Sequence, residues 1–271
     1  MSVDMNLLKK LRDTTFAPLK DCKDALVDSN GDLDAAMEFL KKKGAAQAAK
    51  KADRETNEWA IKTRIIDGRV YAIKMACETD FVVKNEMFAG LTDALMDTIV
   101  THTGDVNNIS ELPSAIAEKC EQLIQEFVGK IGENTKLADV YIHAAPHMFV
   151  YTHPGDKLVS IVYYNPTSDK AEGVAKQVAL QIAAMNPEFL STDTIPAAQR
   201  DTLKAQFVEE VAASGKPADI VEKIVAGKLD KAFAENVLLE QAPIWDDTKK
   251  VKDFTQGALD ITSFVRIAIG A

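Results

Sequence analysis

Apolar residues recur every three or four positions in three short runs at the start of the chain, which is the spacing of one face of an α-helix. The three faces hold Leu7, Leu8 and Leu11, then Leu19, Cys22 and Leu26, then Leu33, Ala36, Met37 and Leu40. Pro18 suits the start of the second helix, and Asn30-Gly31 suits its end. Asp32 can cap the third helix and Gly44 can end it. The pattern predicts a compact three-helix module.

Residues 41–54 are rich in alanine and lysine and offer few side chains to bury. This composition favours a solvated helical or flexible linker. The other interpretation is a basic patch that contacts RNA or an acidic partner. We place the first domain, module and linker together, at residues 1–54.

The middle of the chain alternates between β-rich and helical patterns. Two β-rich runs flank Asp67-Gly68, a strong signal for a two-residue hairpin turn. Later runs predict helices within 88–99, 116–127 and 171–184 and strands within 140–143, 148–152, 158–164 and 261–269. We predict a two-part core, with one half at residues 55–139 and the other at residues 140–194 and 240–271.

Residues 195–239 carry two more helical patterns on either side of Gly215-Lys216-Pro217, which predicts a sharp turn. Two helices joined by a short turn form an antiparallel hairpin that can protrude from a domain. The fold class is therefore α+β, with antiparallel sheets, a helical module and a hairpin insertion.

The charge balance narrows the function. Of 271 residues, 41 are acidic and 32 are basic, and the formal net charge of −9 repels nucleic acid. No apolar run approaches the roughly 18 residues that span a membrane. The N-terminus lacks the pattern of a secretory signal, so we expect a cytoplasmic protein.

Motifs for covalent chemistry, nucleotide binding and metal binding are missing from the sequence. Gly215-Lys216 lacks the upstream glycine of a phosphate loop. The three cysteines are far apart, and Pro146 separates His143 from His147 in a β-rich stretch, so neither set predicts a metal site. We expect a protein that is not an enzyme, uses no cofactor and acts by binding.

The segment C-E-T-D-F-V-V-K-N, residues 77–85, lies where a predicted strand passes into a helix. Thr79 or Asp80 could cap that helix, and Phe81 could pack on its first turn. Taken alone, the residues favour this structural role. The alternative is a rigid corner that presents an acid and an aromatic ring to a partner, because aromatic residues frequently anchor interfaces.

Four motifs, in order, resemble the elongation factor Ts family. C-E-T-D-F-V-V-K-N-E-M-F is similar to its T-D-F-V signature, and L-R-D-T-T-F-A-P-L-K-D-C-K-D-A-L with N-G-D-L-D-A-A resembles its ubiquitin-associated-like N-terminal module. K-I-G-E-N, residues 130–134, resembles a central motif. S-G-K-P-A-D-I-V-E-K-I-V-A-G-K-L, with L-L-E-Q at 238–241, resembles its helical hairpin and the return to the core. The family order and spacing hold over nearly the whole chain.

The resemblance implies a guanine nucleotide exchange factor that makes elongation factor Tu release GDP during translation elongation. In the family, the T-D-F corner enters the GTPase domain of elongation factor Tu. The partner is then GDP-bound or nucleotide-free. The phenylalanine wedges between two partner histidines and the aspartate lies near the magnesium site, roles that fall here on Phe81 and Asp80. The resemblance also implies that the adjoining residues Thr79 and Val82 contact the partner. Disturbed magnesium coordination weakens nucleotide binding without any covalent step.

The resemblance also implies secondary partner contacts at Leu11, Arg12 and Lys23 in the module and at Gln181 and Ile182 in the core. Hairpins of the family can serve assembly. A homo-oligomer or a 2:2 complex through residues 195–239 is therefore a further expectation.

Several positions depart from the family pattern. Phe16 and Pro18 replace usual glycines, no arginine pair follows K-I-G-E-N, and Gln181 replaces a histidine of the partner contact. The sequence also ends soon after F-V-R-I-A-I-G, without the longer C-terminal helix of some relatives. The intact T-D-F corner favours exchange activity. The departures keep an alternative open, a ubiquitin-associated-like scaffold that binds some other partner and has no exchange activity.

Overall fold

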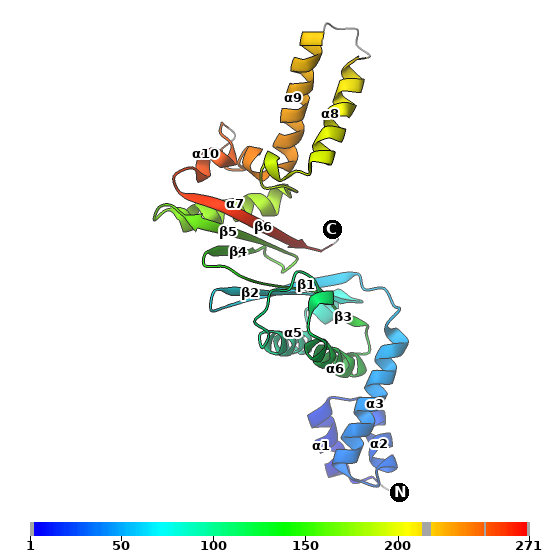
Figure 1. Ribbon diagram of the computed structural model, residues 1–271. Coiled ribbons are helices and arrows are strands. Elements are labelled where there is room, and N and C mark those ends of the chain that lie inside the picture. Colours follow the sequence, from blue (N-terminus) through cyan, green and yellow to red (C-terminus); the bar gives the residue numbers. More distant parts are fainter. Residues whose placement is uncertain (1–2, 213–217, 247, 270–271) are drawn as a thin grey trace. The chain divides into compact units, whose positions relative to one another are not determined.

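The computed structural model describes residues 3–212, 218–246 and 248–269. It divides the chain into two compact units, Met1–Ala144 and Ala145–Ala271. Each unit contains one three-stranded antiparallel sheet with helices beside it (Figure 1). The mixture of helices and antiparallel sheets confirms the predicted α+β class. No helix in the described part of the chain is long and apolar enough to span a membrane.

The first unit begins with the predicted three-helix bundle, formed by α1 (Met5–Thr15), α2 (Leu19–Asp28) and α3 (Leu33–Lys51). Its small core holds Leu8, Leu11, Cys22, Ala25, Leu26 and Ala36. The side chain of Asp32 accepts hydrogen bonds from two backbone N–H groups at the start of α3. Asn30 and Gly31 turn the chain between α2 and α3 with positive φ angles of 53° and 85°. The predicted cap at Asp32 and the predicted turn at Asn30-Gly31 are therefore confirmed.

The predicted end of the third helix at Gly44 is wrong. The helix α3 continues to Lys51, and Gly44 is buried where α3 packs on α6 (Ser114–Ile131) beside Gly129. A Cβ added to Gly129 would lie 2.8 Å from the Cα of Gly44, so glycine here permits close approach of two helices. Much of the predicted linker is thus helix, and α3 serves both the bundle and the rest of the unit.

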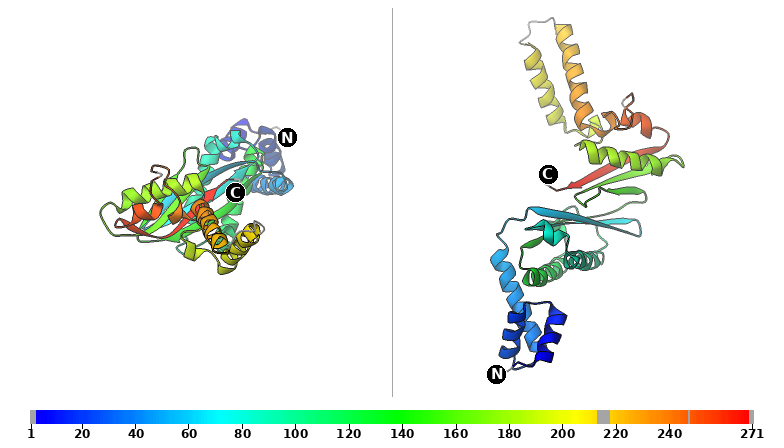
Figure 2. Two further views of the ribbon diagram at one scale, coloured as in Figure 1. Left: turned by 90° about the horizontal axis from the view of Figure 1, so that it is seen from above. Right: turned by 180° about the vertical axis from the view of Figure 1, so that it is seen from behind.

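The sheet of the first unit has the order β1-β2-β3, with β1 (Glu58–Ile66), β2 (Arg69–Cys77) and β3 (Thr135–Ala144). Asp67 and Gly68 join β1 to β2 with φ angles of 49° and 72°, which confirms the predicted hairpin turn. Helices α5 (Glu86–Ile99) and α6 lie together on one face of the sheet (Figures 1 and 2). Two short helices, α4 (Asp80–Val83) and η1 (Ile109–Glu111), complete the unit.

The boundary predicted between residues 139 and 140 falls inside β3. That strand runs without interruption from Thr135 to Ala144 and pairs with β2 along its length, with one register shift. The first unit consequently ends at Ala144 and not at residue 139. Lys136 and Asp139 interrupt the apolar pattern at the start of the strand, which explains why its first half was missed.

The second unit is built on the sheet β4-β5-β6, with β4 (Met148–Thr152), β5 (Leu158–Pro166) and β6 (Leu259–Ala268). Helix α7 (Ala171–Met185) packs on one face of this sheet. The remaining short helices are η2 (Thr192–Thr194), η3 (Leu238–Glu240) and α10 (Val251–Thr255). The last strand, β6, is far from β5 in the sequence but pairs with it in an antiparallel arrangement.

Helices α8 (Ala197–Ala212) and α9 (Ala218–Asn236) contact each other and project from the second unit (Figure 2). Val211 and Val225 are buried in this hairpin. The predicted turn at Gly215-Lys216-Pro217 lies outside the described residues. A hydrogen bond from Leu238 N–H to Phe189 O fixes the chain where it leaves α9.

Candidate functional site

The T-D-F corner, residues Thr79 to Val82, connects the end of β2 to α4. Its two apolar neighbours point in opposite directions: Phe81 is 81% exposed, whereas Val82 is 4% exposed and belongs to the core of the first unit. Among the described residues, no large apolar side chain is more exposed than Phe81. The interpretation of Phe81 as a packing residue is therefore wrong, and its exposure suits contact with a partner. Val82 was expected to contact the partner, but its side chain lies in the core and attaches the corner to the rest of the unit.

Capping at the corner also differs from the prediction. Thr79 occupies the N-cap position of α4, but its hydroxyl donates to the Glu133 carboxylate, with Oγ1···Oε distances of 3.1 and 2.9 Å. The residue that caps a helix through its side chain is Asn85, whose Oδ1 accepts from the Met87 N–H at the start of α5.

Asp80 forms an ion pair with Lys84 one helical turn later, with an Nζ···Oδ2 distance of 2.7 Å. This hydrogen bond lowers the pKa of the Asp80 carboxyl and raises the pKa of Lys84. Asp80 therefore carries its negative charge at neutral pH. The charge lies directly beside the exposed ring of Phe81 in the sequence, so the corner offers one anionic and one aromatic group.

The K-I-G-E-N motif, residues 130–134, braces this corner from behind. Glu133 accepts from Thr79, and the Asn134 N–H donates to Glu78 Oε1 at 2.6 Å. The buried side-chain amide of Asn134 donates in turn to the carbonyl oxygens of Arg54 at 2.7 Å and Ala52 at 3.3 Å. Two sequence motifs that were recognised separately are thus one structure. Periodicity alone could not have revealed it, because the contact joins segments far apart in the chain.

A buried thiol fills the space under the corner. Cys77 Sγ donates to the carbonyl of Thr79 at 3.2 Å. Burial raises the pKa of Cys77 to about 11, so the thiol stays protonated at neutral pH. Cys77 therefore packs and supports the backbone of Thr79.

The further partner contacts expected in the N-terminal module also include both exposed and buried residues. Arg12 and Lys23 are exposed, but Leu11 is buried in the bundle core and cannot reach a partner while the bundle is folded. Phe16 and Leu19 were not proposed as contacts, yet they are 64% and 54% exposed. The signal was available, because Phe16 takes a position usually held by glycine and adopts a left-handed φ of 53° at the end of α1.

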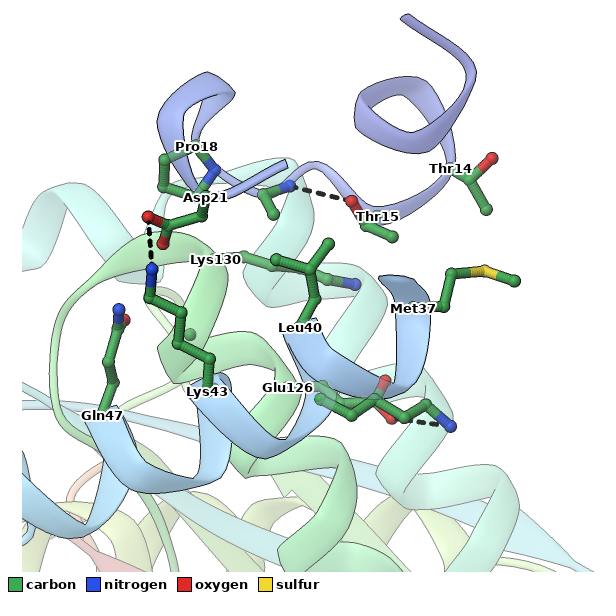
Figure 3. Close-up of a pocket in the computed structure, with 14 residues that line it drawn as sticks. Thr14, Thr15, Pro18, Asp21, Met37, Leu40, Lys43, Gln47, Glu126 and Lys130 are labelled. Atoms are coloured by element: carbon green, nitrogen blue, oxygen red, sulfur yellow. Dashed lines mark hydrogen bonds and ion pairs between the residues drawn. The ribbon is translucent and has the colours of Figure 1, made fainter. Parts of the chain in front are cut away.

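Three of the five lysines of residues 41–54 contact other parts of the first unit. Figure 3 shows Lys43 of α3 directed at Asp21 of α2, beside a cavity between the bundle and α6. The Nζ···Oδ1 distance of this ion pair is 2.8 Å, and the cavity has a volume of about 190 Å³. Lys41 pairs with Glu126 of α6 at 3.7 Å, and Lys51 Nζ donates to the carbonyl of Gly132. These contacts weaken the interpretation of the stretch as an RNA-binding patch and favour a role in holding α3.

Gln181 and Ile182, expected at the partner surface, are both fully buried in the second unit. The amide nitrogen of Gln181 donates to Gln241 Oε1 at 3.0 Å and to the carbonyl of Ala242 at 3.1 Å. Its amide oxygen accepts from the Ile244 N–H at 2.8 Å. Gln181 thus holds the segment after η3 against α7. The expectation of a partner contact at these two positions is wrong for the folded chain.

In an α+β fold with two antiparallel sheets, a helical bundle and a helical hairpin, the corner exposes an acid and an aromatic ring, a pair suited to contact with another protein. Comparison with known families specifies the class. A family model described as "Elongation factor TS" matches residues 78–271.

Relatives named "Elongation factor Ts" match the chain at full length. One from Hydrogenobaculum sp. (strain Y04AAS1) is 39% identical over 276 residues and covers 100% of both chains. One from Chlorobium phaeobacteroides (strain BS1) is 36% identical with 99% of each chain covered, and one from Aquifex aeolicus (strain VF5) is 35% identical with 100% and 99% covered. The chain belongs to the elongation factor Ts family.

Proposed function

We propose that this protein is the guanine nucleotide exchange factor of elongation factor Tu, and that Asp80 and Phe81 enter the GTPase domain of that partner. The observation that carries the proposal is the exposure of Phe81 on a corner that hydrogen bonds of the Glu78 and Thr79 side chains hold to residues 133–134. An aromatic side chain can bury on the order of 150 Å² or more, and at roughly 25 cal/mol per Å² its transfer from water into a partner pocket contributes several kcal/mol.

The proposed mechanism needs binding alone. The factor binds the nucleotide-free or distorted partner more tightly than the GDP-bound partner, and linkage lowers the affinity for GDP by the same factor. The ring of Phe81 supplies apolar binding energy. The ionised carboxylate of Asp80 acts beside the magnesium site, where disturbed coordination weakens the hold on the phosphates.

Stiffness of the corner serves this mechanism. A loop that became ordered only on binding would spend part of its binding energy on lost conformational entropy. The bonds from Thr79 to Glu133 and from Asn134 to Glu78 hold the chain just before the ring, and the buried side chain of Val82 holds it just after. The preformed corner can therefore transfer more of its binding energy to the partner.

Replacement of Phe81 by alanine tests the proposal. We expect Phe81→Ala to reduce the rate at which the factor accelerates release of labelled GDP from elongation factor Tu by at least about tenfold, because a central aromatic anchor is worth on the order of 2 kcal/mol. Stopped-flow fluorescence at several factor concentrations measures this rate. The free energy of unfolding should fall by less than about 1 kcal/mol, since the ring is exposed.

Phe88→Ala provides the matched control. Phe88 is 3% exposed in the core of the same unit, so its truncation should cost about 3–5 kcal/mol of folding stability. Normal GDP release with Phe81→Ala at saturating and subsaturating concentrations would refute the wedge.

An interaction scaffold without exchange activity is the alternative. It predicts that the wild-type chain binds some other partner and leaves the rate of GDP release from elongation factor Tu unchanged in the same stopped-flow trace. The replacement of a family histidine by Gln181 was one argument for this scaffold. Because Gln181 is buried, the replacement does not alter the surface of the protein. The corner is intact, so we favour exchange, in the cytoplasm where translation takes place.

The projecting hairpin is the proposed site of any assembly into a homo-oligomer or a 2:2 complex. Val208 and Ile220, on the two helices of the hairpin, are 42% and 41% exposed. Light scattering of the complex with elongation factor Tu distinguishes the stoichiometries. A mass that stays at 1:1 at high micromolar concentration would contradict assembly.

A further inference from the structure

The hydroxyl of Thr79, at the start of the T-D-F corner, already has a partner inside the first unit. It donates to the Glu133 carboxylate, whose two Oε atoms lie 3.1 and 2.9 Å from Thr79 Oγ1. A hydroxyl has one proton to donate, so this proton is not free for another protein while the bond lasts. Among the described residues, the Thr79 side chain makes no capping bond to α4. Its hydroxyl therefore serves to hold the corner to Glu133.

Glu133 is a fixed acceptor, because both of its neighbours in the sequence are tied to the end of α3. The carbonyl of Gly132 accepts a hydrogen bond from Lys51 Nζ. The side-chain amide of Asn134, which is buried, donates to two backbone carbonyl oxygens just after α3. Since the backbone is held on both sides of Glu133, a side chain that bonds to its carboxylate takes a defined position relative to α3.

The corner depends on such contacts, because α4 has only four residues and a helix this short is not stable through its own hydrogen bonds. After Phe81, the buried side chain of Val82 attaches α4 to the core. Before Phe81, the nearest contacts are those of Thr79. Its carbonyl accepts from Cys77 Sγ at 3.2 Å, and its hydroxyl donates to the carboxylate. A thiol is a weak donor, whereas a hydrogen bond to a carboxylate is charge-assisted, so the hydroxyl bond is the stronger of the two.

We propose that Thr79 and Glu133 are positioning residues for nucleotide exchange, and that their hydrogen bond sets the place and direction of the Phe81 ring before the partner binds. This inference rests on the exchange proposal and changes the expected role of one residue, because Thr79 supports the contact surface instead of belonging to it. It also gives the K-I-G-E-N motif, residues 130–134, a task in exchange. A ring that is already in place loses less conformational entropy on binding.

Substitutions at the two ends of the hydrogen bond test the proposal by stopped-flow fluorescence. Thr79→Val keeps the shape of the side chain and removes the hydroxyl, so the acceleration of GDP release from elongation factor Tu should fall about fivefold. Thr79→Ser keeps the hydroxyl and should stay within about twofold of wild type. Glu133→Ala removes the acceptor and should also lose about fivefold. The double variant should lose no more than either single one, because both changes remove the same bond.

The Phe81→Ala background separates positioning from a merely structural role. With no ring to place, Thr79→Val should cause no further loss of exchange there, whereas a structural role would lower the rate by the same factor in both backgrounds. Thr92→Val is the matched control, because the buried Thr92 hydroxyl donates to Ala89 O at 2.8 Å within α5 of the same unit. That variant should lower the free energy of unfolding and leave the rate of GDP release unchanged.

A fluorine label keeps this inference distinct from the exchange proposal. The analogue para-fluorophenylalanine at position 81 reports the motion of the ring by fluorine NMR without any partner. Transverse relaxation of the fluorine should be slower in Thr79→Val, because the ring moves more freely, and unchanged in Thr79→Ser. A wild-type chain that does not accelerate GDP release would contradict the exchange proposal, and the fluorine relaxation would still decide the positioning role. Equal relaxation in wild type and Thr79→Val, or equal losses of rate with and without the Phe81 ring, would overturn the inference.

Discussion

At the scale of single residues, one buried amide determines where the chain lies after it leaves the hairpin. Gln181 donates twice and accepts once, to three groups between Gln241 and Ile244. Gln241 in turn donates to the carbonyl of Glu235, at the end of α9. Partners of a buried amide depend on it, because each of them is costly when unpaired.

Gln181→Leu should therefore lower the free energy of unfolding of the chain by at least about 2 kcal/mol, because it leaves several buried polar groups without partners. Urea denaturation followed by circular dichroism measures the loss. The same variant should accelerate GDP release normally while folded. Unchanged stability together with slow exchange would show instead that the residue contacts the partner.

Neighbouring residues show what the family resemblance could and could not predict about the site. It favoured a ring that faces outward over the packing role that local chemistry suggested, and the ring of Phe81 is exposed. It could not tell exposed from buried neighbours, because motif matching assigns a segment while side-chain direction depends on packing. Phe81 and Val82 differ in this way, and so do Arg12 and Leu11.

At the scale of elements, two glycines allow α3 and α6 to touch through their backbones. The two positions are not equivalent. A Cβ at Gly44 would meet Gln125 O at 3.5 Å, an ordinary contact, whereas a Cβ at Gly129 would lie 2.8 Å from the Cα of Gly44. Backbone atoms cannot move aside without shifting a helix.

Alanine at each position should consequently have opposite effects. Gly44→Ala should stabilise the chain by up to about 1 kcal/mol, since alanine favours the helix over glycine. Gly129→Ala should destabilise it by about 1–3 kcal/mol, because the overlap forces the helices apart. Thermal unfolding of the two variants side by side measures both signs. Equal melting temperatures would mean that the helices are not in close contact.

The elements predicted correctly are those that local chemistry determines. The hairpin turn at Asp67-Gly68 needs positive φ at two successive residues, and Asp-Gly is a residue pair that favours this conformation. Gly44 was misinterpreted because glycine serves both to end helices and to let helices approach, and only the tertiary structure decides between the two. The first half of β3 was missed for a related reason, since its pairing with β2 overrides its polar residues.

At the scale of the whole molecule, sharing α3 between the bundle and α6 determines where the chain can be cut. The apolar residues Ala36 and Leu40, in the first half of α3, pack in the bundle, and the second half covers α6. The apolar contacts that stabilise the bundle therefore end near residue 40. The sequence-based boundary after residue 54 includes part of the support of α6.

Two truncations separate these boundaries. Removal of residues 1–40 should leave the rest folded and weaken binding to elongation factor Tu, because the exposed surface with Arg12 and Phe16 is lost. Removal of residues 1–54 should lower the free energy of unfolding by a further few kcal/mol, because apolar surface of α6 is uncovered. Urea midpoints and a binding titration measure the two effects. Equal midpoints would restore the boundary at residue 54.

The unbroken course of α3 also has a consequence for how fast the protein can act. A helix of 19 residues is about 28 Å long, and it joins the bundle without a break to the rest of the first unit, which carries the T-D-F corner. When one surface engages a partner, the other is presented at a high effective concentration without the losses of a flexible tether. Each contact can then be weak on its own while the pair holds firmly. A complex held by two weak contacts can come apart one step at a time, as a factor that serves many partner molecules in succession requires.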